Sequence, residues 1–327
     1  MIVSETPFRI SLFGGGTDFP GYFRQHGGEV LGFSIDKYCR ILVRNLPPFF
    51  HYRSRIVWSK TELVNEPEQI QHPVIREALK RRPKLRRIEL FHEGDLPANS
   101  GVGSSSSFCV GLLKVFDALE GVCQSPRSLA LQAIQLERED LGESGGWQDQ
   151  IFAAYGGFNH IHFHQSGGFR VYPIIMPKPR MDALMERLVL VYLGKGRIAS
   201  ELESRKVEAM EKNTAVLKCM RDYCRAGVEI LQRGSVDDLG LLLHTSWRAK
   251  RQLTHGVSTP EIDRVYDMAR EAGAVGGKIL GAGGGGFMLL FVGPQSKEHV
   301  LERLSDLVHV PFNLSESGSR ISVYEGE

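Results

Sequence analysis

PANSGVGSSSSFCVG, residues 97–111, places glycines and a run of four serines directly before an apolar helical pattern. A strand-like run, residues 87–96, precedes it, so we expect a turn between a strand and a helix. A helix start leaves backbone N–H groups without partners and attracts anions. Gly101 and Gly103 would let the backbone approach an anion, and the serine hydroxyls could cap the helix, bind phosphate or ligate a metal. The stretch predicts a phosphate-binding helix start; an ordinary capped helix is the alternative.

Two common nucleotide-binding motifs fit this chain poorly. The P-loop motif G-x-x-x-x-G-K-S/T needs a lysine that the loop lacks, so a phosphate would be held differently. Residues 281–292, GAGGGGFMLLFV, match G-x-G-x-x-G, which in a dinucleotide-binding fold continues into a helix. Here an apolar run typical of a buried strand follows. We therefore expect a glycine-rich hairpin whose bare backbone packs against another loop, and we give a nicotinamide-dependent oxidoreductase little weight.

A further glycine cluster lies near the amino terminus. Residues 7–23, PFRISLFGGGTDFPGYF, place three glycines, Thr17 and Asp18 directly after a strand-like run. An aspartate beside bare backbone is suited to accepting hydrogen bonds from sugar hydroxyls. Asp18 is equally suited to cap a following helix, and the segment alone does not separate these interpretations.

Two carboxylates further along have the chemistry that phosphoryl transfer requires. Glu137 lies in a predicted helix, and Asp149 follows in GGWQDQ, residues 145–150. Transfer from ATP needs a carboxylate on magnesium and a group that orients or deprotonates the attacking hydroxyl. Taken alone, Glu137 in the acidic run ERED is better explained as part of a solvated face.

Three alternating histidines, His160, His162 and His164, share one face of a predicted strand. Such a set could gather a metal ion. We prefer the simpler interpretation, in which Ile161 and Phe163 point into the core and the histidines line the wetter face.

The composition is that of an ordinary globular protein. The 327 residues are 42% apolar and 24% charged, with a net charge of +2, which favours neither nucleic acid nor an acidic membrane as partner. The five cysteines are scattered with no CxxC pair, so we expect neither a disulfide framework nor a zinc site, and a cytoplasmic location. The longest apolar run is broken by glycines and is shorter than the ~20 residues of a membrane span. The amino terminus does not resemble a signal peptide.

The order of patterns predicts an α+β protein of two lobes. Strand patterns dominate the first third, helical patterns follow, and LVLVYLG, residues 188–194, reads as the last strand of the first half. Residues 199–273 are almost wholly helical in pattern. We place the two domains at residues 1–190 and 191–327.

Four motifs in order resemble those of the GHMP kinases, the superfamily of galactokinase, homoserine kinase and mevalonate kinase. They are PFRISLFGGGTDF, PANSGVGSSSSFCVG, GGWQDQ and KILGAGGGGF. The resemblance implies a ribosomal S5-like N-terminal lobe and an α/β sandwich C-terminal lobe. The form FGGGTD is similar to that of sugar kinases acting on heptose 7-phosphate or L-fucose, and it lacks the glutamate and histidine of galactokinases.

The resemblance implies a role for each motif. ATP is expected at Pro97, Asn99, Ser100, Gly101, Val102, Gly103, Ser104, Ser105 and Ser106, and Mg²⁺ at Ser105 and Glu137, with Ser104 as the alternative serine. Asp149 is expected to act on the acceptor hydroxyl and Arg9 to stabilise the transferring phosphoryl group. The sugar is expected at Gly15, Gly16, Thr17, Asp18, Gly283 and Gly284. A phosphate on the sugar would need cations, for which we take Lys195 and Arg197.

The implied activity is an ATP-dependent sugar kinase that phosphorylates the anomeric hydroxyl of D-glycero-D-manno-heptose 7-phosphate. The alternatives are an L-fucose kinase or another sugar 1-kinase, or a sugar and ATP sensor without catalysis. The expected partners are small molecules, and a homodimer is left open.

Overall fold

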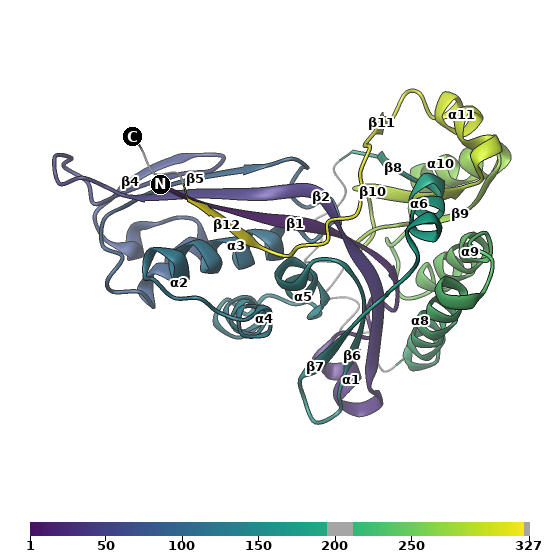
Figure 1. Ribbon diagram of the computed structural model, residues 1–327, viewed down its shortest axis with the longest axis horizontal. Helices are drawn as coiled ribbons and strands as arrows, with labels where there is room; N and C mark the ends of the chain where they lie inside the picture. The colour runs from purple at the N-terminus through teal and green to yellow at the C-terminus, as the bar shows by residue number, and fades with distance from the viewer. Residues whose placement is uncertain (195–211, 324–327) are drawn as a thin grey trace.

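Two β-sheets organise the residues that the computed structural model describes, 1–194 and 212–323 (Figure 1). The first has eight strands in the order β12-β1-β2-β5-β3-β4, with β6 paired to β2 and β7 to β6. Its strands are β1 Ile2–Phe13, β2 Gly28–Asn45, β3 Ser54–Val57, β4 Thr61–Val64, β5 Ile88–Gly94, β6 Phe158–Phe163, β7 Phe169–Pro173 and β12 Arg320–Val323. The second runs β11-β8-β10-β9, with β8 Leu188–Tyr192, β9 Ala274–Ile279, β10 Phe287–Val292 and β11 Val308–His309.

The helices form two groups along the chain. Those before the second sheet are α1 Pro20–His26, α2 Pro73–Lys80, α3 Ser104–Leu119, α4 Pro126–Ile134, α5 Gln148–Tyr155 and α6 Lys178–Arg187, and those after it begins are α8 Thr214–Arg233, α9 Asp238–Lys250, α10 Pro260–Glu271 and α11 Pro294–Arg303. In Figure 1, α2 to α5 lie along one side of the first sheet, while α9 and α10 contact β9 of the second. The α+β class and the two lobes agree with the sequence prediction.

The strand β1 is buried from Thr6 to Phe13 because it lies inside the first sheet with α3 and α5 packed on it. Pro7 cannot donate to a sheet ladder, and the β1–β2 register shifts between Pro7 and Phe8. Such an irregularity bends a strand and redirects the side chains that follow, among them Arg9.

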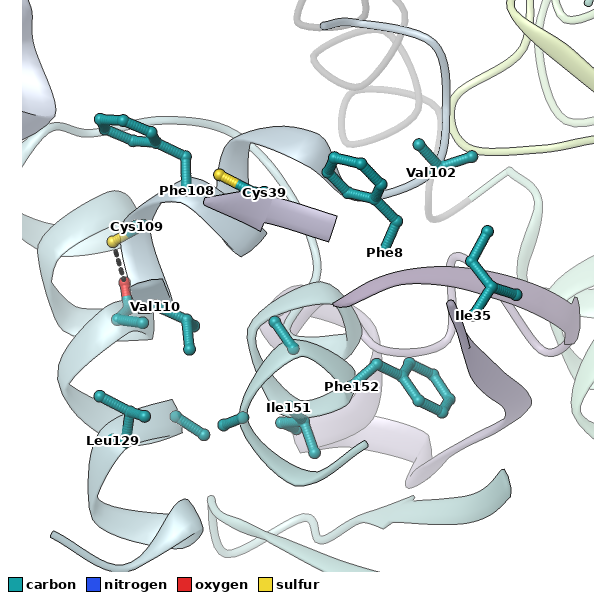
Figure 2. Close-up of a cluster of buried hydrophobic side chains, with 14 of the residues drawn as sticks. Phe8, Ile35, Cys39, Val102, Phe108, Cys109, Val110, Leu129, Ile151 and Phe152 are labelled. Atoms are coloured by element: carbon teal, nitrogen blue, oxygen red, sulfur yellow. Dashed lines mark hydrogen bonds between the residues drawn. The ribbon is translucent and has the colours of Figure 1, made fainter. Parts of the chain in front are cut away.

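The core of the first lobe forms where α3 and α5 meet the sheet. Figure 2 shows Val110 of α3, Ile151 and Phe152 of α5, and Phe8 and Ile35 of the sheet in one buried cluster. Residues 104–111, from the first serine to Gly111, thus form the first half of α3, a helix that is buried on most of its surface. Each fully buried side chain of this size contributes about 1.5–3 kcal/mol to folding.

Two strands join a different sheet from the one that the order of sequence patterns predicts. The strand β8, predicted as the last strand of the first half, instead pairs with β10 and β11 in the second sheet. Conversely β12, near the end of the chain, pairs antiparallel with β1, with Ile2 opposite Val323. Both pairings bring together strands that are far apart in sequence, and a local sequence pattern cannot predict such pairings. The division at residue 190 stays a prediction.

The cysteines and the apolar segments can now be placed in the fold. All five cysteines are free thiols, as their scattered spacing predicts. Among the helices of the described residues, none combines the length and apolarity that a bilayer crossing requires.

The glycine-rich segment 281–286 forms the turn before a strand, as predicted, and packs its bare backbone against the loop that precedes α3. A Cβ on Gly281 would lie 2.5 Å from Cα of Gly101, and one on Gly286 would lie 2.3 Å from the carbonyl oxygen of Ser100. Phe287 N–H donates to that same carbonyl at 3.0 Å. The strand β10 follows, buried at all six positions, so the helix that a nicotinamide-binding motif requires is absent after Gly286.

Gly286→Ala is expected to lower the free energy of unfolding by about 1–3 kcal/mol or more. The added Cβ would collide with the carbonyl oxygen of Ser100, and φ is +84° at this position. Urea unfolding monitored by circular dichroism measures the loss.

Gly167→Ala is the matched control, because φ is +88° there and nothing lies within 4 Å of the added Cβ. It carries the backbone strain without the collision, so its loss should be smaller. Equal losses in the two variants would show that the loop contact contributes nothing.

Candidate active site

An ion pair between Arg9 and Asp149 lies at the centre of the site. Arg9 Nε donates to Asp149 Oδ1 at 2.8 Å, and Arg9 Nη2 donates to Oδ2 at 2.7 Å, so the pair is bidentate. Arg9 projects from β1 after the register shift, and Asp149 lies in the first turn of α5. The arginine side chain is 4% exposed and the aspartate side chain 23% exposed, so the carboxylate remains accessible.

The loop of residues 97–103 closes over this pair. Arg9 N–H donates to the carbonyl of Val102 at 3.0 Å, and Arg9 Nη1 donates to the carbonyl of Gly101. Gly103 has φ +76°, and a Cβ there would lie 3.2 Å from Cγ of Arg9. Glycine is therefore required at position 103 both for the turn and for the close approach.

The remaining loop residues have different positions. Ser100 and Val102 are buried, and Ser100 Oγ donates to the carbonyl of Pro97 at 2.6 Å. Asn99 has φ +58° and lines the pocket at the start of α3. This helix-start pocket, of about 550 Å³, is also lined by Gly101, Gly103 and the serines at 104–106. The helix start thus borders a cavity, whereas a simply capped helix needs none.

The serines at the start of α3 reach Glu137. Ser105 Oγ donates to Glu137 Oε1 at 3.2 Å, and Ser106 Oγ donates to Oε2 at 2.9 Å. Ser104 Oγ instead accepts from the backbone N–H of Asn99 at 3.2 Å. Of the two serines considered for the metal, the geometry therefore brings Ser105 and not Ser104 to Glu137.

Glu137 is a buried carboxylate rather than part of a solvated face. It is 0% exposed and also accepts from Nε2 of Gln150. Its segment, Gln135–Asp140, is a π-helical turn, a local widening that often occurs at functional sites. Burial raises its pKa, although the neighbouring Arg138 and the hydrogen bonds from Gln150 and Ser106 oppose that effect. A carboxylate with hydroxyl neighbours offers the oxygen ligands that Mg²⁺ prefers.

The first glycine cluster places Asp18 in a second pocket. Asp18 Oδ1 accepts from Gly16 N–H at 2.9 Å and Oδ2 from Gln148 N–H at 3.2 Å, and Asp18 does not cap α1. Burial raises the pKa of Asp18, the Gly16 hydrogen bond lowers it, and the nearby Asp149 raises it. This Asp18 pocket is lined by Gly15, Gly16, Arg9 and Asp149 among others, and so adjoins the ion pair.

Three predicted sugar-contact residues lie elsewhere. Thr17 is fully buried, and its hydroxyl holds the loop by bonding the carbonyls of Gly14 and Glu29. Gly283 and Gly284 pack against Val257, while Gly281 and Ala282 line the Asp18 pocket. Lys195 and Arg197 lie outside the described residues.

Three cations of the Asp18 pocket, Arg138, Lys250 and Lys278, were not predicted from the sequence. Lys278 Nζ donates to the carbonyls of Ser11 and Leu12 at 2.9 and 2.8 Å, linking β9 to β1 across the lobes. Lys250 Nζ donates to the carbonyls of Ile279 and Gly281, both at 2.7 Å. Arg138 lines both this pocket and the helix-start pocket. The only local signal was the position of Lys278 beside the third glycine motif.

An aromatic pocket of about 460 Å³ adjoins the helix start and was also missed. Its lining includes Trp58, His72, His92, Phe108, Asn99 and Ser104. The rings contact one another, with centroids 4.7 Å apart for His72 and Phe108 and 4.8 Å for His92 and Phe108. Such a surface can hold a flat, weakly polar ring system.

The candidate site thus contains a pocket at a helix start, a buried carboxylate, and an arginine-paired aspartate beside a second polar pocket. These are groups of the kind that phosphoryl transfer requires. Two protein-family models match the chain. The model described as "GHMP kinases N terminal domain" matches residues 70–157, and the model described as "GHMP kinases C terminal" matches residues 228–309. The chain is 31% identical over 317 residues to D-glycero-alpha-D-manno-heptose 7-phosphate kinase of Campylobacter jejuni, covering 93% of each.

Two further relatives extend the comparison. The L-fucokinase/L-fucose-1-P guanylyltransferase of Bacteroides fragilis is 24% identical, covering 98% of this chain and 38% of that protein. A crystal structure of D-glycero-D-manno-heptose 1-phosphate kinase from Bacteroides thetaiotaomicron has a TM-score of 0.81 at 25% identity, covering 99% of this chain and 100% of that one. The chain belongs to the GHMP kinases and, within them, is a sugar kinase.

Glu137→Gln is expected to raise the free energy of unfolding of the ligand-free protein at neutral pH by about 0.5–2 kcal/mol. Burial raises the pKa of Glu137 above its usual value of 4.5, so the folded state holds this proton more tightly than the unfolded chain does. The stabilising contribution is therefore present below pH 4.5 and is lost as the pH rises through the folded-state pKa. Urea unfolding of both proteins from below pH 4.5 to neutral pH measures this difference in the free energy of unfolding.

Glu139→Gln is the matched control, since Glu139 is exposed on the same π-helical turn. Its replacement should leave the free energy of unfolding at neutral pH unchanged. A Glu137→Gln variant that is no more stable than the wild type at neutral pH would contradict the assigned cost of burying this carboxylate.

Proposed function

We propose that this sugar kinase transfers the γ-phosphoryl group of ATP to the anomeric hydroxyl of D-glycero-D-manno-heptose 7-phosphate, with Mg²⁺ as cofactor. The observation that carries the proposal is the position of Asp149, which lines both the helix-start pocket and the Asp18 pocket. A donor in one pocket and an acceptor in the other would meet at its carboxylate.

The pockets suit the separate parts of ATP. The aromatic pocket suits the adenine ring, because Trp58 and Phe108 offer flat apolar faces. The start of α3 suits the phosphates, because its backbone N–H groups and partial positive charge favour anions. Ser105 and Glu137 would hold Mg²⁺, which when bound neutralises charge on the transferring group.

Arg9 and Asp149 would then act on the reacting groups. Asp149 can accept the proton of the attacking hydroxyl, and its hydrogen bonds to Arg9 fix its orientation. Arg9 also lines the helix-start pocket, where it would stabilise negative charge on the transferring phosphoryl group. Phosphoryl transfer depends mainly on such positioning and electrostatics, so a preformed pair is the expected design.

The charges of the Asp18 pocket support a phosphorylated sugar. Its lining contains the cations Arg9, Arg138, Lys250 and Lys278 and the carboxylates Asp18 and Asp149. The four cations outnumber the two carboxylates, and a neutral sugar would not require this positive charge. The relative from Campylobacter jejuni, named for heptose 7-phosphate, points to the same substrate class.

Asp149→Asn is expected to lower kcat by roughly 10²- to 10⁴-fold, because asparagine cannot accept the hydroxyl proton. Binding of ATP, measured by calorimetry, should be unchanged. The control is Asp182→Asn, whose carboxylate is 59% exposed and pairs with Lys178 on the same helix, α6. Full activity of Asp149→Asn would show that Asp149 does not accept the hydroxyl proton.

A substrate screen tests the proposed sugar. Heptose 7-phosphate, unphosphorylated heptose, L-fucose and galactose are compared by ADP release, and kcat/KM is expected to favour heptose 7-phosphate by roughly 100-fold or more. Higher kcat/KM for L-fucose would identify a fucose kinase instead. Tight binding of sugar and ATP without turnover would indicate a sensor.

A further inference from the structure

Two residues that line the Asp18 pocket carry buried polar atoms without a hydrogen-bond partner. Ser11 Oγ and Gln148 Oε1 are both buried, and neither has a partner within residues 1–194 and 212–323. Both residues line the pocket, and Ser11 is 5% exposed, so bulk water does not supply the missing bond. A buried polar atom without a partner costs free energy and calls for an explanation, which a ligand in this pocket would provide.

These two side chains are neighbours in sequence of the Arg9–Asp149 ion pair. Ser11 follows Arg9 by two positions on β1, so the two side chains project from the same face of that strand. Gln148 directly precedes Asp149 at the start of α5. A substrate whose hydroxyl reaches Asp149 therefore brings its adjacent substituents toward Ser11 and Gln148.

Backbone hydrogen bonds hold both residues in place. The carbonyl of Ser11 accepts from Lys278 Nζ at 2.9 Å. The backbone N–H of Gln148 donates to Asp18 Oδ2 at 3.2 Å. Neither bond involves the Ser11 hydroxyl or the Gln148 amide oxygen, so the positions of these groups are restrained without using their own bonding capacity.

Gly15 lies between the two polar groups. A Cβ on Gly15 would lie 3.8 Å from Ser11 Oγ and 3.6 Å from Gln148 Nε2, which are ordinary contact distances. The backbone of Gly15 is outside the left-handed region that Gly14 and Gly16 adopt. Neither conformation nor packing therefore requires glycine at position 15. Its missing side chain instead leaves room in the pocket for a ligand group that would contact both Ser11 and Gln148.

We infer that Ser11 and Gln148 bind the sugar hydroxyl next to the one that is phosphorylated, which is the 2-hydroxyl when the anomeric hydroxyl reacts. The inference rests on the proposed function, since it takes the Asp18 pocket as the sugar site and Asp149 as the group at the reacting hydroxyl. A hydroxyl both donates and accepts, so it can donate to Gln148 Oε1 and accept from Ser11 Oγ. An analogue without this hydroxyl would leave both buried atoms unsatisfied, so the two residues select against it.

A comparison of D-glycero-D-manno-heptose 7-phosphate with its 2-deoxy counterpart tests this selection. The wild type should favour the full sugar by roughly 100-fold or more in kcat/KM. Ser11→Ala should raise KM for the full sugar by roughly 5- to 100-fold and leave kcat/KM for the 2-deoxy sugar nearly unchanged, so the preference shrinks. Gln148→Leu, which keeps the size of the side chain and the backbone N–H, should act in the same direction.

Ser34→Ala controls for the loss of a buried serine hydroxyl. Ser34 lies opposite Arg9 on β2 and is fully buried, but its hydroxyl donates to the carbonyl of Phe152 at 3.0 Å. Its replacement should lower the free energy of unfolding in urea and preserve the preference for the full sugar. Ser11→Ala removes an unsatisfied group, so it should lose the preference and no stability.

The outcomes separate this inference from the proposed function. If heptose 7-phosphate is not phosphorylated, the proposed substrate is wrong, and the comparison is made with L-fucose and 2-deoxy-L-fucose. For whichever sugar reacts, an equal preference for the 2-hydroxyl in the wild type and in Ser11→Ala would overturn the inference and leave the kinase assignment intact. Turnover of neither sugar would overturn both.

Discussion

Contact between two stretches of bare backbone is the constraint on which the site depends. Gly281 and Gly286 approach the loop before α3 so closely that no Cβ fits between them. The contact joins the second sheet to the loop that closes over Arg9, and Lys278 adds a second connection by donating to carbonyls of β1. The two lobes are thus joined at the position where donor and acceptor would meet, so the relative placement of the pockets follows from backbone packing.

Buried charges at the site are balanced in different ways. Asp149 has the bidentate guanidinium of Arg9, and Asp18 has backbone N–H donors. Among the described residues, Glu137 accepts hydrogen bonds only from the neutral side chains of Ser105, Ser106 and Gln150, and the nearby Arg138 offsets the cost of burial only in part, since the pKa of Glu137 is still raised. Burying a carboxylate among neutral donors is costly, and a bound cation would offset that cost. The destabilising arrangement at Glu137 is therefore informative about function.

The sequence allowed prediction of features that depend on local physics. The glycines and serines before α3, the buried strand after Gly286, and the aspartate of GGWQDQ all have local signatures. The carbonyl partners of Lys250 and Lys278, the aromatic pocket around Phe108 and the burial of Glu137 do not, because they arise from residues brought together by the fold. For the same reason the sequence did not predict that β8 joins the second sheet and β12 the first. Thr17 was assigned to the sugar because its motif resembles the first motif of GHMP kinases, whereas its hydroxyl bonds the carbonyls of Gly14 and Glu29.

The pairing of β12 with β1 has a consequence for synthesis of the chain. The first sheet begins with Ile2 and gains its last strand only when Arg320–Val323 arrive, and Thr6 Oγ1 and Ser319 Oγ lie 2.8 Å apart across this seam. The chain between β1 and β12 is therefore synthesised while one edge of β1 still lacks its neighbour. Strands that follow one another in the chain can pair as they are made, whereas β1 waits for a partner that is made much later.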